Sequence, residues 1–179
     1  MPGFISFIYI LDIAIIIFVL AHRGMLHGVF EESFYLLATM LAAFGALTNF
    51  DWVATIIKNY WSPSSNIYIP EAIAILLIYL FIRGILAGST LYIVGKIRRI
   101  ELIKPISKVS GAIIGAIKGL IIASMVLVFL YYMLSPTSML SDPLRNPNDV
   151  IVQWTMKSAT NIYNVFVGIF GVDHLKFLG

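Results

Sequence analysis

The chain has 179 residues, of which 60% are hydrophobic and 12% are charged, and its mean hydropathy is +0.94. Soluble domains are about half apolar and about a quarter charged, so this composition excludes a water-soluble globule and indicates a membrane protein. The net charge of +3 comes from basic residues that are too few and too dispersed for nucleic-acid binding. The absence of cysteine excludes disulfides, thiolate metal ligands and cysteine nucleophiles.

Four apolar stretches are long enough to cross a bilayer, which takes about 20 residues in a helix. We expect these spans at about 4–21, 33–50, 71–95 and 111–134. Pro70 and Glu71 favour a helix start at the third span, because proline and an acid suit the first turn. All spans must be helical, since lipid offers the backbone no hydrogen-bond partners. The predicted fold is therefore an all-α membrane protein, with a four-transmembrane-helix bundle over residues 1–134.

The tail, residues 135–179, begins with a loop and continues with a helix at about 149–170. Apolar residues such as Ile151 and Trp154 form one face of this helix, and polar residues such as Lys157 and Asn161 form the other. A fifth span would place those polar groups in hydrocarbon. We therefore favour an amphipathic C-terminal helix on the membrane surface. A second surface helix is predicted before Pro63, because Trp52, Ile56 and Tyr60 recur at four-residue spacing.

Charge distribution predicts the orientation in the membrane. The segment between the third and fourth spans has one acid and five basic residues, namely Lys96, Arg98, Arg99, Lys104 and Lys108. Short basic loops stay in the cytoplasm, which places this segment and Arg23 inside and both termini outside. The same loop would attract anionic lipid headgroups, and docking of a cytoplasmic partner is the alternative.

Small residues predict where the helices pack. Gly111, Gly115 and Gly119 recur every four residues at the start of the fourth span, and Gly84 and Gly88 do so in the third. Helices in lipid attract one another through close backbone approach, which small residues permit. We expect packing within the bundle, with formation of a homo-oligomer through the same ridge as the alternative.

Three ionisable residues fall inside the predicted spans: Asp12, Arg83 and Lys118. An unpaired charge there costs at least about 2.5–3.5 kcal/mol. We expect Asp12 and Arg83 to form a buried ion pair, although a relay for protons or solutes is a second interpretation. Lys118 lies one to two turns inside the start of the fourth span, so its long side chain is expected to extend back to the interface.

The first inner loop, residues 22–32, places Glu31 and Glu32 before the second span, where acids oppose the positive end of the helix dipole. His27 and Glu31 are four residues apart, but no second group of ligands accompanies them, so no metal site is expected. No phosphate loop, paired metal motif or serine elbow is present, so the sequence predicts no cofactor and no enzymatic activity.

Several of these features together resemble the colicin V production protein (CvpA) family of bacterial inner-membrane proteins. The matching residues are Leu11-Asp12, then Arg23-Gly24, Gly28 and Glu31 or Glu32, and finally the block from Gly111 to Gly119. The resemblance covers about residues 10–134. In the family pattern, Asp12 marks the outer start of the first span instead of its middle.

The resemblance implies a multi-pass protein of the bacterial inner membrane with an accessory role in toxin production or in the envelope. Its partners would be lipid and other membrane proteins. The competing hypothesis is a subunit of a small oligomeric transporter or channel, with Asp12, Arg83 and Lys118 along a path.

Overall fold

The computed structural model describes residues 2–60, 69–97, 104–135, 137–146 and 149–170. Four long helices form the bundle: α1 (Pro2–His27), α2 (Val29–Tyr60), α3 (Ile69–Ile97) and α4 (Lys104–Met133). A 3-10 turn, η1 (Met139–Ser141), and a short helix, α5 (Asp142–Arg145), lead to α6 (Val150–Phe170). The described part of the chain has no strand, and its four long helices are long and apolar enough to cross a membrane. The predicted all-α bundle with four spans is confirmed.

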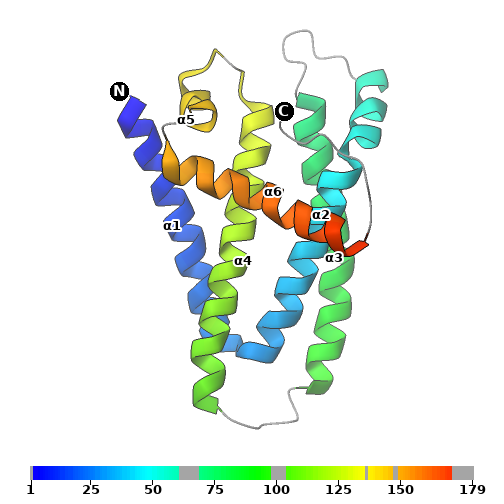
Figure 1. The fold of residues 1–179 in the computed structure, drawn as a ribbon. Coiled ribbons are helices and arrows are strands. Elements are labelled where there is room, and N and C mark those ends of the chain that lie inside the picture. The colour runs from blue at the N-terminus through cyan, green and yellow to red at the C-terminus, as the bar shows by residue number, and fades with distance from the viewer. Residues whose placement is uncertain (1, 61–68, 98–103, 136, 147–148, 171–179) are drawn as a thin grey trace.

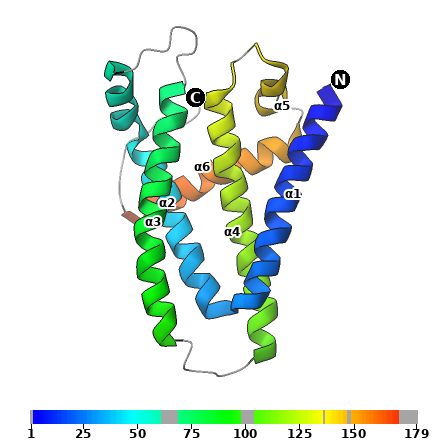
Figure 2. The same ribbon diagram turned by 180° about the vertical axis from the view of Figure 1, so that it is seen from behind.

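The helices are arranged with α1 and α3 on opposite sides and with α2 and α4 between them (Figures 1 and 2). Helix α1 packs chiefly against α4, and α2 packs against both α3 and α4. The start of α1 lies at one end of the bundle. At the same end α2 ends, α3 begins and α4 ends. We call this the N end, and we call the opposite end, where α1 turns into α2, the Gly28 end.

The turn between α1 and α2 is far shorter than the predicted loop over residues 22–32. Helix α1 continues to His27 and α2 begins at Val29, so Gly28 alone separates them. Its φ angle is 79°, a left-handed conformation that side chains with a Cβ disfavour by about 1–2 kcal/mol. Glycine therefore lets the chain reverse without a loop, and Glu31 and Glu32 become part of the first turn of α2.

The predicted surface helix around Trp52–Tyr60 is instead the last part of α2. No proline or glycine interrupts the chain between Ala46 and Tyr60, so the second span simply continues. This extension stays packed on α3: Ala54 is buried, and Lys58 forms an ion pair with Glu71 at 2.5 Å. The prediction was wrong because an amphipathic pattern does not reveal which element covers the apolar face.

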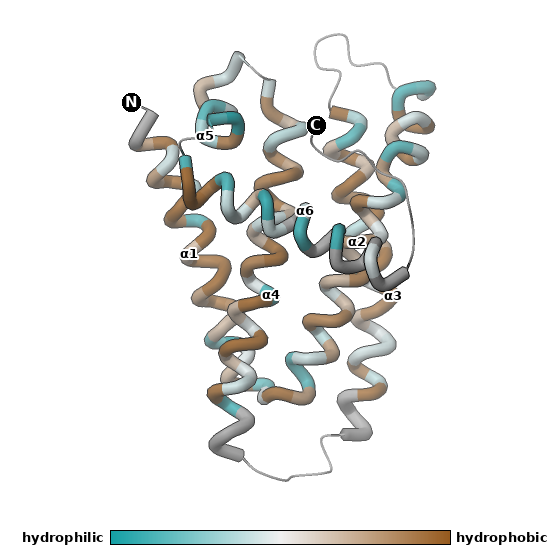
Figure 3. Tube along the Cα trace, in the orientation of Figure 1, coloured by the Kyte–Doolittle hydropathy of each residue, from teal (hydrophilic) through white to brown (hydrophobic). Residues whose placement is uncertain are grey.

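The core of the bundle is lined by small side chains of α2. Ala43, Ala46 and Leu47 are buried against α3 and α4, where Ile75 and Val128 complete the same apolar cluster. Apolar residues predominate along the long helices (Figure 3), and many large apolar side chains are exposed, among them Phe18, Phe81 and Ile113. A soluble protein rarely exposes apolar residues on this scale, whereas lipid solvates them.

Helix α6 crosses the bundle at a steep angle instead of running parallel to the spans (Figure 1). Val152, Thr155 and Met156 are buried, and the Ser124 hydroxyl of α4 lies 2.7 Å from the Thr155 carbonyl oxygen. Ser124 precedes the end of α4 by nine residues, which is about 14 Å along a helix. The helix therefore packs on the bundle well below its N end, a depth that the sequence did not indicate.

Candidate functional site

Glycines join α1 and α4 at backbone contact. A Cβ atom at Gly115 would overlap the Leu20 carbonyl oxygen, and one at Gly119 would lie 2.8 Å from the Ile17 Cα atom. Gly24 and Gly111 face each other in the same way across the two helices. The glycines of α4 thus pack inside one chain. Gly84 and Gly88 of α3 differ from the sequence expectation, because nothing lies within 4 Å of a Cβ atom added at either position.

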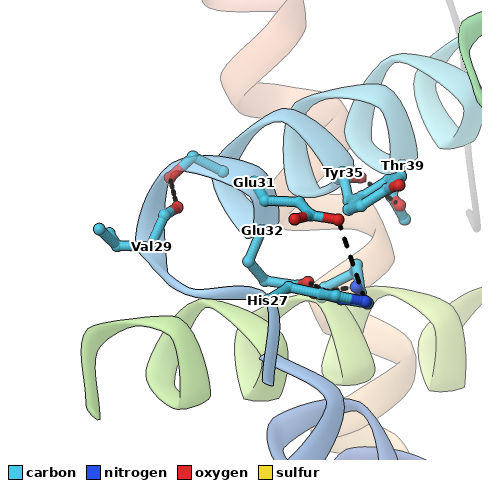
Figure 4. A network of polar contacts seen from close by, with 8 residues as sticks. His27, Val29, Glu31, Glu32, Tyr35 and Thr39 are labelled. Carbon is cyan, nitrogen blue, oxygen red and sulfur yellow. Dashed lines mark hydrogen bonds and ion pairs between the residues drawn. The ribbon is translucent and has the colours of Figure 1, made fainter. Parts of the chain in front are cut away.

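A buried ion pair lies toward the Gly28 end. Lys118 Nζ of α4 contacts Glu32 Oε1 of α2, and the two side chains are 4% and 0% exposed. His27 lies beside both acids, with Nδ1 3.5 Å from Glu32 Oε2 and Nε2 3.9 Å from Glu31 Oε1 (Figure 4). A charge pair with this burial holds α2 to α4, since removing either partner leaves the other charge isolated in an apolar interior.

Tyr35 extends the cluster toward α3. Its ring lies 5.5 Å from Lys118 Nζ and 5.7 Å from the Arg83 guanidinium carbon, so the ring contacts a cation from each of two helices. The His27 ring lies 5.9 Å away, and Thr39 donates a hydrogen bond to the Tyr35 carbonyl oxygen. We call His27, Glu31, Glu32, Tyr35, Arg83 and Lys118 the charged cluster. It connects α2, α3, α4 and the last residue of α1.

Arg83 is one of the incompletely satisfied members of the cluster, as is Glu32 at its Oε2 atom. The Nη1 atom of Arg83 is buried and has no hydrogen-bond partner among the described residues. The contact with Tyr35 is a cation–π interaction, which offers a desolvated guanidinium about 2 kcal/mol but no oxygen acceptor.

The expected ion pair between Asp12 and Arg83 is not formed. The two residues lie on helices at opposite sides of the bundle (Figures 1 and 2). Asp12 is exposed on the outward face of α1. The expected snorkelling of Lys118 is also wrong, because its amino group points to Glu32 inside the bundle. Hydropathy gives the depth of a residue along a helix, whereas a pairing also depends on the face that the helix presents.

Sequence reasoning treated Glu32 as a residue at a helix start and as part of the family pattern, not as a partner of Lys118, and it did not consider Tyr35. A signal was present, because Glu32, Tyr35 and Thr39 follow one another at spacings of three and four residues along α2. That pattern places all three on one face. Polar residues on one face of a membrane helix indicate a partner inside the bundle.

The remaining predicted residues lie around the Gly28 end. Arg23 is exposed, Gly24 is buried against α4, and Lys108 is exposed at the start of the fourth span. Arg98 and Arg99 lie outside the described residues, as do the side chains of Lys96 and Lys104. Lipid contact of this basic loop therefore stays a prediction.

The charged cluster offers cations beside its acids instead of a place for a metal ion. Among the described residues, no three histidines or acids converge as metal ligands. Lys118 already occupies the position next to Glu32. The cluster thus contains the acids Glu31 and Glu32 together with the cations Arg83 and Lys118, of which Lys118 is paired with Glu32.

These features define a multi-pass α-helical membrane protein whose bundle contains a closed cluster of charges. Residues 11–158 match the model of a family described as Colicin V production protein, so the chain belongs to that family. The match continues through α5 and into α6, beyond residue 134, where the sequence resemblance ended. Comparison with curated proteins and with solved structures found no match.

Proposed function

We propose that this protein is an accessory component of the bacterial inner membrane that supports production or export of a peptide toxin, or maintenance of the envelope, by binding other membrane components and without catalysis. The family match supports the toxin-related role. The observation that carries the non-catalytic role is the enclosure of Glu32 and Lys118, because charges committed to each other inside a bundle stabilise it and do not reach a substrate.

The experiment is complementation in a bacterium that carries the colicin V production genes and lacks its own member of this family. Expression of the full chain is expected to restore toxin activity in the medium or growth in detergent, with the chain detected in the inner-membrane fraction. Insertion of the chain without recovery of either property overturns the proposal. Reporter fusions after Lys104 and after Gly179 test the orientation, with the first expected inside and the second outside.

A transport assay separates this proposal from the channel hypothesis. Purified protein in liposomes is expected to conduct no ions under an imposed voltage or pH gradient. Conductance that disappears in an Arg83→Gln variant, but not in an Asp51→Asn variant, would instead place the charged cluster on an ion-conducting path. Asp51 is a suitable control because its side chain is exposed on the last part of α2, remote in sequence from the cluster.

A further inference from the structure

A cavity with a partly polar and partly apolar wall lies toward the N end, between α6, α5 and the end of α4. Its volume is about 610 Å³, and its described lining residues include Tyr131, Arg145, Gln153, Lys157 and Asn161. Leu144 and Met156 form an apolar part of the wall. No acidic residue is among the described lining residues, whereas two of them are cations. The cavity therefore favours an anion.

Arg145 is fixed in place at this cavity. Its guanidinium carbon lies 4.2 Å from the centre of the Tyr131 ring, and Nη2 donates a hydrogen bond to the Tyr131 carbonyl oxygen at 3.2 Å. Its Nε atom is buried and has no hydrogen-bond partner in the part of the chain that the structure describes. A guanidinium held rigid at the wall of a cavity is suited to a phosphate oxygen.

The position of α6 places part of the cavity wall beside the candidate fourth span, Lys108–Met133. Met156, in its wall, directly follows Thr155, whose carbonyl is beside Ser124, about 14 Å from the end of α4. Trp154 and Ile151, which are 60% and 48% exposed, belong to the same helix. Cations beside exposed apolar residues match the two parts of a phospholipid, a charged headgroup and acyl chains.

We propose that this cavity binds the phosphate-bearing headgroup of an anionic phospholipid, with Arg145 and Lys157 contacting the phosphate and with acyl chains lying along the exposed apolar residues of α6. The site is distinct from the basic loop at the Gly28 end, because it lies at the opposite end of the bundle. The site also explains why α6 crosses the bundle. In that position the polar residues of α6 line a lipid headgroup site instead of facing hydrocarbon.

The test is quenching of Trp154 fluorescence by brominated lipids. The full chain carries Trp52→Phe and Trp61→Phe, so Trp154 is the remaining tryptophan. At equal mole fraction, brominated phosphatidylglycerol is expected to compete for the site at least about fivefold better than brominated phosphatidylcholine. The double change of Arg145→Gln and Lys157→Gln is expected to remove this preference. Lys108→Gln at the Gly28 end is the matched control and is expected to retain it.

Equal quenching by the two lipids in the parent protein overturns the proposal, and so does a preference that survives the double change. Lys157 is exposed, so Lys157→Gln alone serves as the test if the Arg145 variant does not fold, with at least about a twofold loss of preference expected. Excess glycerol 1-phosphate is expected to leave the quenching unchanged. Release by that soluble phosphate would identify a water-soluble ligand and overturn the lipid assignment.

Discussion

Lys118 of α4 and Glu32 of α2, 86 residues apart in the chain, form an ion pair in which both side chains are almost completely buried. The pair lies between helices that also share an apolar cluster, so polar and apolar contacts hold the same interface. Because the two charges depend on each other, changes to one of them are expected to be more severe than changes to both.

Glu32→Gln is expected to lower the free energy of unfolding by about 3–5 kcal/mol, because it removes the carboxylate that contacts the buried Lys118 ammonium. The double variant Glu32→Gln, Lys118→Met is expected to lose less than Glu32→Gln alone. Unfolding in mixed detergent micelles measures both. Lys58→Gln breaks the half-exposed pair with Glu71 and is the control, with an expected loss below about 1 kcal/mol. A Glu32→Gln variant as stable as this control contradicts the prediction.

Gly115→Ala is expected to destabilise the bundle by about 1–3 kcal/mol or more, because the added methyl group overlaps the Leu20 carbonyl oxygen and α1 must move away from α4. Thermal unfolding in detergent provides the measurement. Gly84→Ala is the matched control on α3, where a Cβ atom meets nothing within 4 Å. This control is expected to leave stability unchanged or to raise it slightly, since alanine favours helix more than glycine does. Equal losses in the two variants are the contrary result.

Tyr35→Leu is expected to cost more stability than Tyr35→Phe. Phenylalanine keeps the ring face toward Lys118 and Arg83, whereas leucine removes both cation–π contacts. The expected difference is about 1–2 kcal/mol in the free energy of unfolding, measured in the same micelles. If the two variants have the same free energy of unfolding, the Tyr35 ring contributes only apolar volume and the prediction is wrong.

Ser124→Leu is expected to separate α6 from the bundle, because it forces a large side chain into the contact where the Ser124 hydroxyl meets the Thr155 carbonyl oxygen. Hydrogen exchange of the amides of residues 150–158 is expected to become faster. Ser124→Ala removes a single hydrogen bond and is expected to cost only about 1 kcal/mol. Val126→Leu, at a half-exposed position of α4, is the control and is expected to leave the exchange unchanged. Slow exchange in the Ser124→Leu variant contradicts the packing described.

The sequence was sufficient to predict the four spans, because uninterrupted apolar stretches of this length have no stable alternative in lipid. The predicted positions of the helix ends were less accurate. The Gly28 turn is shorter than the charged residues around it suggested, and α2 continues past Trp52, since the bilayer edge is not a helix boundary when no proline or glycine marks one.

The glycine block from Gly111 to Gly119 was recognisable from its four-residue spacing, which indicates close approach, but the spacing is the same for any partner helix. Only the packing of α4 against α1 decided that Leu20 and Ile17 lie opposite. The same spacing predicted close packing at Gly84 and Gly88, but no helix lies against them, because α3 turns that face away from the bundle.

The composition and order of residues thus determined that this chain is a membrane bundle. The free energy of moving an apolar segment from water into lipid depends only on the residues of that segment. Tertiary structure alone decided that Lys118 pairs with Glu32, that Asp12 and Arg83 lie on opposite sides, and that α6 crosses the bundle. Pairings of this kind depend on how each helix is rotated about its axis. That rotation is set by packing between distant segments and is not encoded at any one position.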